Sequence, residues 1–99
     1  MAFTIKIEPE AKQDIQNGIT WYNQQKSGLG SKFHSSIKAH LVTLRTTPFH
    51  QIRYDHVHCL PLKKFPYMIH YTVDEENQKV IVHGVFNTAR NPKIWKTRK

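Results

Sequence analysis

The chain has 99 residues, with 15 Lys and Arg against 7 Asp and Glu, which gives a formal net charge of +8. This length predicts a single domain over residues 1–99 and excludes a deep cleft between two domains. The excess positive charge favours phosphates or acidic proteins as partners, because a basic surface attracts them over long range.

The first half of the chain predicts a strand followed by two amphipathic helices. Phe3, Ile5 and Ile7 alternate with polar residues, which is typical of a half-buried strand that ends at Pro9. The break at 27–30 is short, so the two helices on either side of it should form an antiparallel hairpin. Apolar positions recur at helical spacing in both: Ala11, Ile15, Ile19 and Tyr22 in the first, and Leu29, Phe33, Ile37, Leu41 and Leu44 in the second.

The second half predicts three strands and a basic tail. Strands are expected over Ile52–Leu60, Tyr67–Val73 and Val80–Phe86, where β-branched and aromatic residues are concentrated. The order β-α-α-β-β-β predicts an α+β fold, with a helical hairpin packed on one face of a mostly antiparallel four-stranded sheet. The C-terminal tail at about 88–99 holds five Lys and Arg and no acidic residue.

Basic, phenolic and imidazole groups near the middle of the chain are candidates for chemistry. Lys63 and Lys64 lie at a bend just before the strand that carries Tyr67 and His70. Such groups bind phosphate or transfer protons. Strand alternation puts His70 and Tyr71 on opposite faces, so these groups cannot all belong to one site. The face that carries Tyr67 is equally compatible with a place in the core.

The histidines and the cysteine do not predict a metal site. His56 and His58 fall on one face of a strand, but no CxxC or HExxH spacing accompanies them, so we expect no metal and no cofactor. Cys59 is the one cysteine and is expected to be a small buried residue. No apolar run approaches the ~20 residues of a membrane span, and no charged leader precedes the first strand. We therefore expect a cytoplasmic protein that does not bind membranes.

An ordered set of motifs resembles the RelE/ParE superfamily of bacterial toxins. The resemblance spans nearly the whole chain and implies the same β-α-α-β-β-β fold. It also implies the toxin half of a type II toxin–antitoxin pair, often called a plasmid stabilisation protein. The motifs are Trp21-Tyr22, Gly28-Leu29-Gly30 with Phe33, Pro48, the segment 65–71 and the ending 85–95.

The superfamily implies two different mechanisms. RelE-like members cut mRNA in the ribosome, where basic side chains stabilise the attacked phosphate and a 2′-hydroxyl is the nucleophile. A RelE-like activity in this chain would be a metal-independent endoribonuclease that uses Lys63, Lys64 and Arg90, with Tyr67 and His70 as weaker matches. ParE-like members instead inhibit DNA gyrase by binding.

The ending of the chain favours the ParE-like interpretation. Arg90-Asn91-Pro92 followed by Trp95 resembles the ParE pattern, although Asn87 stands where many relatives have histidine. The resemblance then implies a non-enzymatic inhibitor of DNA gyrase that is neutralised by a cognate antitoxin. The residues expected to bind its partner are Arg90, Lys93, Trp95 and Lys96.

Other interpretations remain compatible with the sequence. One is the ribosome-dependent endoribonuclease, with the ribosome and mRNA as partners, and another is a superfamily member that acts only as a protein-binding module. Antitoxin segments in this family are often acidic and amphipathic, and such a segment would cover apolar area between the helices and the sheet. The resemblance is compatible with a homodimer and with a toxin–antitoxin hetero-oligomer.

Overall fold

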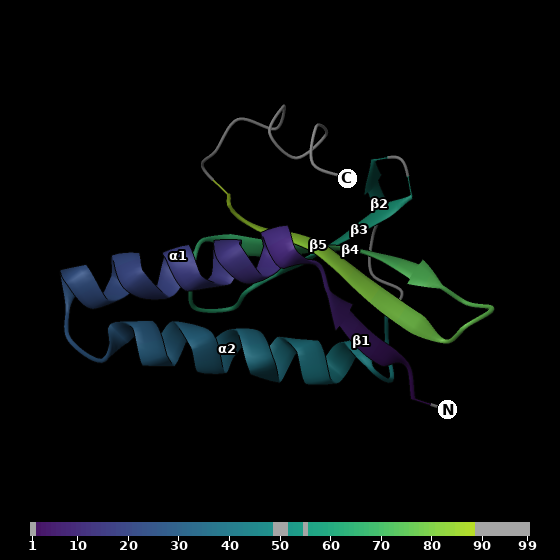
Figure 1. Ribbon diagram of the computed structural model, residues 1–99, viewed down its shortest axis with the longest axis horizontal. Helices are drawn as coiled ribbons and strands as arrows, with labels where there is room; N and C mark the ends of the chain where they lie inside the picture. The colour runs from purple at the N-terminus through teal and green to yellow at the C-terminus, as the bar shows by residue number, and fades with distance from the viewer. Residues whose placement is uncertain (1, 49–51, 55, 89–99) are drawn as a thin grey trace.

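Two antiparallel helices pack on one face of a single sheet in the computed structural model (Figure 1). The structure describes residues 2–48, 52–54 and 56–88. Its elements are β1 (Thr4–Ile7), α1 (Pro9–Gln25), α2 (Leu29–Leu44), β2 (Ile52–Tyr54), β3 (Val57–Pro61), β4 (Tyr67–Asp74) and β5 (Lys79–Asn87). The α+β class and the helical hairpin expected from the sequence are confirmed. No described helix is long and apolar enough to cross a membrane.

The sheet is mixed, with the strand order β1-β5-β4-β3-β2. β1 runs parallel to β5, and Ile5 and Ile7 lie opposite Val80 and Val82. The pairs β5-β4, β4-β3 and β3-β2 are antiparallel. The expectation of a mostly antiparallel sheet therefore holds, and β1 is the exception.

One predicted strand is divided in two. In place of a continuous strand over Ile52–Leu60, the chain forms β2 and β3, so the described sheet has five strands where four were expected. The two strands pair antiparallel, and Ile52 lies opposite His58. Between them His56 has φ 67°, a left-handed conformation that helps to reverse the chain. The turn contains no glycine or proline, so the sequence pattern does not indicate it.

The turn between the helices depends on close contact between them. Gly28 adopts φ 88° just before α2, a conformation that costs glycine little. At the start of α2 the backbone N of Gly30 donates a hydrogen bond of 2.9 Å to Oδ1 of Asn23 in α1. This bond satisfies one of the amide groups that a helix N-terminus leaves unpaired. Gly30 also lies directly against the backbone carbonyl of Ile19, where a larger side chain would not fit.

The core lies between the hairpin and the sheet, and it is built from both predicted helical faces. At its centre four aromatic rings have centroids 4.9–6.1 Å apart in five pairs. Each such pair contributes about 0.5–1.5 kcal/mol beyond its buried area. The rings are those of Tyr22, Phe33, Phe65 and Tyr67. This aromatic cluster ties the loop between β3 and β4, which carries two candidate lysines, to both helices.

Candidate functional site

The candidate residues that the structure describes lie in three different environments. Lys63 and Lys64 are exposed in the loop between β3 and β4. Tyr67, at the start of β4, faces the helices and is 9% exposed. His70 is fully buried on the opposite face of the sheet. The remaining candidates, Arg90, Lys93, Trp95 and Lys96, lie outside the described residues.

His70 packs among apolar groups. Its Nδ1 lies 3.6 Å from Sγ of Cys59, and its ring meets that of Phe86 edge-on with centroids 4.9 Å apart. Cys59 is buried, as expected from the sequence. These contacts place the imidazole away from solvent and away from the Tyr67 face. They favour a packing role for His70 over proton transfer in concert with Tyr67 or the lysines.

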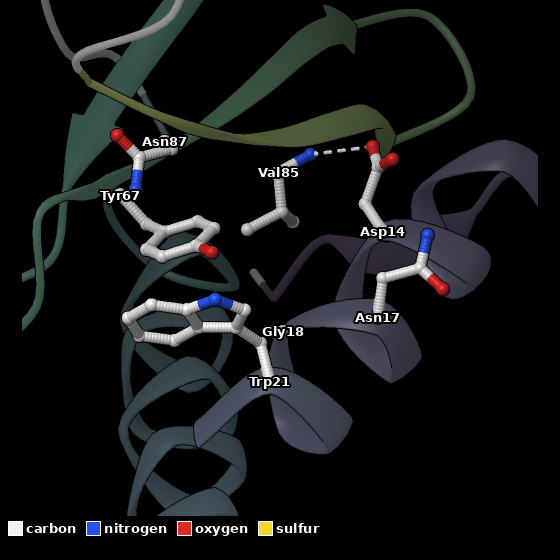
Figure 2. A pocket seen from close by; sticks show the side chains of 7 residues that line it. All are labelled: Asp14, Asn17, Gly18, Trp21, Tyr67, Val85 and Asn87. Atoms are coloured by element: carbon white, nitrogen blue, oxygen red, sulfur yellow. Dashed lines mark hydrogen bonds between the residues drawn. The ribbon is translucent and has the colours of Figure 1, made fainter. Parts of the chain in front are cut away.

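A cavity of about 340 Å³ opens between α1 and the ends of β4 and β5 (Figure 2). The indole of Trp21 and the ring of Tyr67 extend toward the same space, and the Tyr67 hydroxyl is turned into it. On the other side, Oδ2 of Asp14 accepts a hydrogen bond of 3.1 Å from the backbone N of Val85, which fastens α1 to β5. The lining residues are Asp14, Asn17, Gly18, Trp21, Tyr67, Val85 and Asn87.

The chemistry of this cavity suits recognition of a partner side chain. Trp21 is 51% exposed although it is large and apolar, and exposed tryptophans beside a cavity are typical binding anchors. The exposed indole of Trp21 can attract a cation, and the Asp14 carboxylate complements one. Tyr22 packs against both Trp21 and Tyr67; burial raises the pKa of its hydroxyl, and the neighbouring Tyr67 adds to the effect. Tyr22 is therefore neutral at physiological pH.

A second concave surface runs along α2, and we call it the α2 groove. It consists of two adjoining cavities of about 580 and 420 Å³ that share Ala39, His40 and Lys63. The side formed by α2 and the residues after it contributes Ser31, Lys32, Ser35, Ser36, Ala39, His40, Thr43 and Thr47. The other side contributes Leu60, Pro61, Lys63, Lys64 and Phe65. The two candidate lysines therefore belong to this groove and do not line the Tyr67 cavity.

The sequence reasoning missed two basic residues of the groove, Lys32 and His40. A usable signal was present, because the sequence has no Asp or Glu between Asp14 and Asp55. An acid-free stretch of this length containing a complete helix indicates that its exposed face is basic. In the part of the chain that the structure describes, no group of three or more His, Cys, Asp or Glu is arranged to hold a metal ion.

Comparison with known families and structures identifies one family and one fold. Over residues 5–92 the sequence matches the family described as the ParE toxin of the type II toxin–antitoxin system parDE. No curated protein sequence matches the chain. Among solved structures, the fold is similar to the chromosomal ParDE system of P. aeruginosa, with 13% identity and a TM-score of 0.77 over 87% of this chain and 96% of that chain.

Two RelE structures from E. coli have similar folds. An arginine-to-alanine double mutant of the toxin RelE in the free state is 20% identical, with a TM-score of 0.74 over 99% of this chain and 95% of that chain. The intact RelBE toxin–antitoxin complex also matches at 20% identity, with a TM-score of 0.69 over 90% of this chain and 100% of that chain. At these identities the structural matches establish a shared fold, and the family assignment rests on the sequence match.

Proposed function

The chain belongs to the ParE toxin family of type II toxin–antitoxin systems, and we propose that it inhibits DNA gyrase by binding and is neutralised by a cognate antitoxin. The observation that carries this proposal is the family match over residues 5–92, which includes the segment around Arg90. The partner-binding residues that we propose there, Arg90, Lys93, Trp95 and Lys96, belong to the basic ending of the chain.

The placement of the other candidates supports binding over chemistry. General acid–base catalysis needs its groups within hydrogen-bond reach of the reacting atoms, about 2.6–3.2 Å. Tyr67 faces the helices, whereas His70 is buried beside Cys59 on the opposite face of the sheet. The exposed lysines line a different surface, the α2 groove. These side chains do not converge on one substrate position. A catalyst needs such convergence, whereas a protein that inhibits by binding does not.

An antitoxin partner follows from the same family. The similar structures include toxin–antitoxin complexes, among them RelBE of E. coli and RelBE2 of Mycobacterium tuberculosis. We propose that this chain likewise pairs with an antitoxin encoded by an adjacent reading frame. Expression of the chain alone should stop growth, and co-expression with that antitoxin should restore it. Normal growth without the antitoxin would contradict a toxin function.

The alternative is a RelE-like ribosome-dependent endoribonuclease. The exposure of Lys63 and Lys64 favours it, because a phosphate could reach both ammonium groups from solvent. In that case Lys63, Lys64 and Arg90 would stabilise the attacked phosphate. A member that acts only as a protein-binding module would show neither gyrase inhibition nor cleavage.

A paired assay separates these functions. The purified chain is added to a gyrase supercoiling reaction and, separately, to ribosomes programmed with a defined mRNA. Blocked supercoiling with intact mRNA supports the proposal, whereas cleavage of mRNA in the ribosome supports the alternative and refutes it. Lys64→Ala and Arg90→Ala should abolish any cleavage if the catalytic assignment is right. The matched control is Lys12→Ala, an exposed lysine of α1 that lines neither concave surface.

A further inference from the structure

We propose that the cavity of Figure 2, which we call the Trp21–Tyr67 cavity, binds an arginine side chain that projects from a partner protein. The chemistry of that side chain follows from the cavity itself, whereas the identification of the partner as DNA gyrase rests on the proposed function. The cavity shares no lining residue with the α2 groove, so the two surfaces can be tested separately.

The hydroxyl of Tyr67 is a buried polar group at the wall of this cavity. Tyr67 is 9% exposed, and its ring packs against Phe33, while its hydroxyl is turned into the cavity (Figure 2). Within the part of the chain that the structure describes, this hydroxyl forms no hydrogen bond. A buried phenol usually has a hydrogen-bond partner, because an unpaired polar group is costly to bury. A donor on a ligand in the cavity supplies that partner.

Asp14 makes the charge of the cavity negative. It is the only charged side chain among the described residues that line the cavity, although the whole chain carries a net charge of +8. Its Oδ2 accepts a 3.1 Å hydrogen bond from the backbone N of Val85, which holds the carboxylate in place. A carboxylate accepts hydrogen bonds at both oxygens, so it can bind the backbone and a ligand together. A cationic ligand is attracted here, and an anionic one is repelled.

The remaining walls suit the long, flat side chain of arginine. The indole of Trp21 is 51% exposed, and a planar guanidinium group stacks on such a ring. Val85 contributes an apolar part of the lining, against which the methylene groups of the side chain can pack.

The position of the acceptors favours arginine over lysine. The Asp14 carboxylate comes from α1 and the Tyr67 hydroxyl from β4, so acceptors lie on two different walls of the cavity (Figure 2). A guanidinium group has five N–H donors in a rigid fork and can reach both walls at once. The ammonium group of lysine is a compact point charge that is more strongly hydrated, so it loses more on entering the cavity.

The partner that fits the whole molecule has a mixed charge. A chain with a net charge of +8 attracts acidic proteins over long range. Within the cavity the local carboxylate decides, because screening limits distant charges to about 8 Å at physiological ionic strength. A segment with acidic side chains only is repelled by Asp14. The cavity therefore selects a protein surface on which an arginine projects from acidic surroundings.

The test measures binding of a blocked arginine, Nα-acetyl-arginine amide, to the ¹⁵N-labelled full chain by NMR at about 0.15 M ionic strength. The resonances to follow are the indole N–H of Trp21 and the backbone amides of Val85 and Asn87, which line the cavity. A single side chain should bind with a Kd on the order of 1–10 mM. The blocked citrulline, a neutral analogue of the same shape, should bind about fivefold or more weakly, and the blocked lysine about threefold more weakly.

Three cavity variants and one control assign the contacts. Tyr67→Phe should weaken binding about fivefold without lowering Tm, because the hydroxyl has no partner among the described residues. Asp14→Asn should weaken it about fivefold, and its amide oxygen can still accept the bond from Val85. Trp21→Leu should weaken it about threefold or more. The control Glu76→Gln changes the net charge as Asp14→Asn does, on an exposed residue between β4 and β5, and should have no effect.

Weaker arginine binding in all three cavity variants, with an unaffected control, supports the inference. It is overturned if blocked arginine leaves the cavity resonances unchanged, if citrulline or lysine binds as tightly, if a cavity variant binds as the parent does, if the control weakens binding equally, or if Tyr67→Phe lowers Tm. Free arginine that binds more tightly than the blocked form would assign a small-molecule site and overturn docking of a protein.

Gyrase inhibition is measured separately, so the inference and the proposed function can fail independently. A chain that binds blocked arginine but leaves gyrase active retains the cavity's specificity and loses the proposed function. A chain that inhibits gyrase without binding arginine retains the proposed function and overturns the inference.

Discussion

The contact between the two helices makes a quantitative prediction for Gly30→Ala. Inside a helix, alanine is favoured over glycine by about 1 kcal/mol, so propensity alone predicts a more stable protein. At this site, however, a Cβ would lie well inside 3.0 Å of the Ile19 carbonyl oxygen and 2.7 Å from Asn23 side-chain atoms. The carbonyl belongs to the backbone of α1 and cannot rotate away, so the helices must separate.

The cost of that separation exceeds the gain in propensity. Overpacking costs about 1–3 kcal/mol. The hydrogen bond from Gly30 N to Asn23 Oδ1, 2.9 Å long, is strained or lost, and such bonds contribute about 0.5–1.5 kcal/mol. After subtraction of the propensity gain, we expect the free energy of unfolding to fall by about 1–3 kcal/mol. For a chain of this size, that lowers Tm by about 5–20 °C.

Circular dichroism during thermal and urea denaturation measures this effect. Ser35→Ala is the matched control, because Ser35 is an exposed residue of the same helix and the change should stay within about 0.5 kcal/mol. The reasoning is refuted if Gly30→Ala is as stable as the parent or more so. That result would mean that α1 and α2 do not approach as closely as the structure has them.

Three further substitutions test other parts of the structure. Tyr71→Phe removes a buried hydroxyl that donates a 2.7 Å hydrogen bond to the Pro48 carbonyl oxygen, and should lower the free energy of unfolding by about 1–2 kcal/mol; an unchanged urea midpoint would contradict that bond. Asn77→Ala removes the side-chain hydrogen bond that lowers the pKa of Asp74, so NMR titration should show this pKa rising. Because the folded-state pKa is lowered, the bond stabilises the fold at higher pH, and this stabilisation is lost as the pH falls through the folded-state pKa of Asp74. Trp21→Ala removes a half-exposed side chain whose ring packs edge-on against Tyr22, and should lower the free energy of unfolding by about 1–2 kcal/mol. If the cavity contacts the toxin's target, the variant loses gyrase inhibition at a temperature well below its Tm, where it is still folded. Full inhibition would exclude that role.

The sequence predicts the hairpin well because its two apolar stripes are long and regular. Positions such as Ala11 and Phe33 are fully buried where the helical spacing put them. The division of the predicted strand into β2 and β3, in contrast, has no comparable signal in the sequence. A left-handed residue at His56, without glycine or proline beside it, leaves no pattern in a β-rich segment. The parallel pairing of β1 with β5 depends on how distant segments meet, which local periodicity does not encode.

The candidate site was harder to predict than the fold for a related reason. Strand alternation correctly separated His70 from Tyr71, but it could not show that His70 is fully buried beside Cys59. The lysine pair stood out in the sequence, whereas its position opposite Lys32 depends on how the loop folds back on α2. The composition therefore predicts the positive charge, whereas the packing of the loop against α2 determines which lysines lie opposite one another.

The two concave surfaces share one packing partner in the core, Phe33, and this constrains how mutations can be interpreted. Phe65, at the floor of the α2 groove, and Tyr67, at the Trp21 cavity, both pack on Phe33, with centroids 5.3 and 4.9 Å away. A substitution of Phe33 would cost about 3–5 kcal/mol and would disturb both surfaces together. Only exposed residues can separate their roles. Lys64 probes the groove and Trp21 probes the cavity, because each is exposed and lines only one of the two surfaces, so a loss of binding in one of these variants assigns the partner to that surface while the core around Phe33 stays intact.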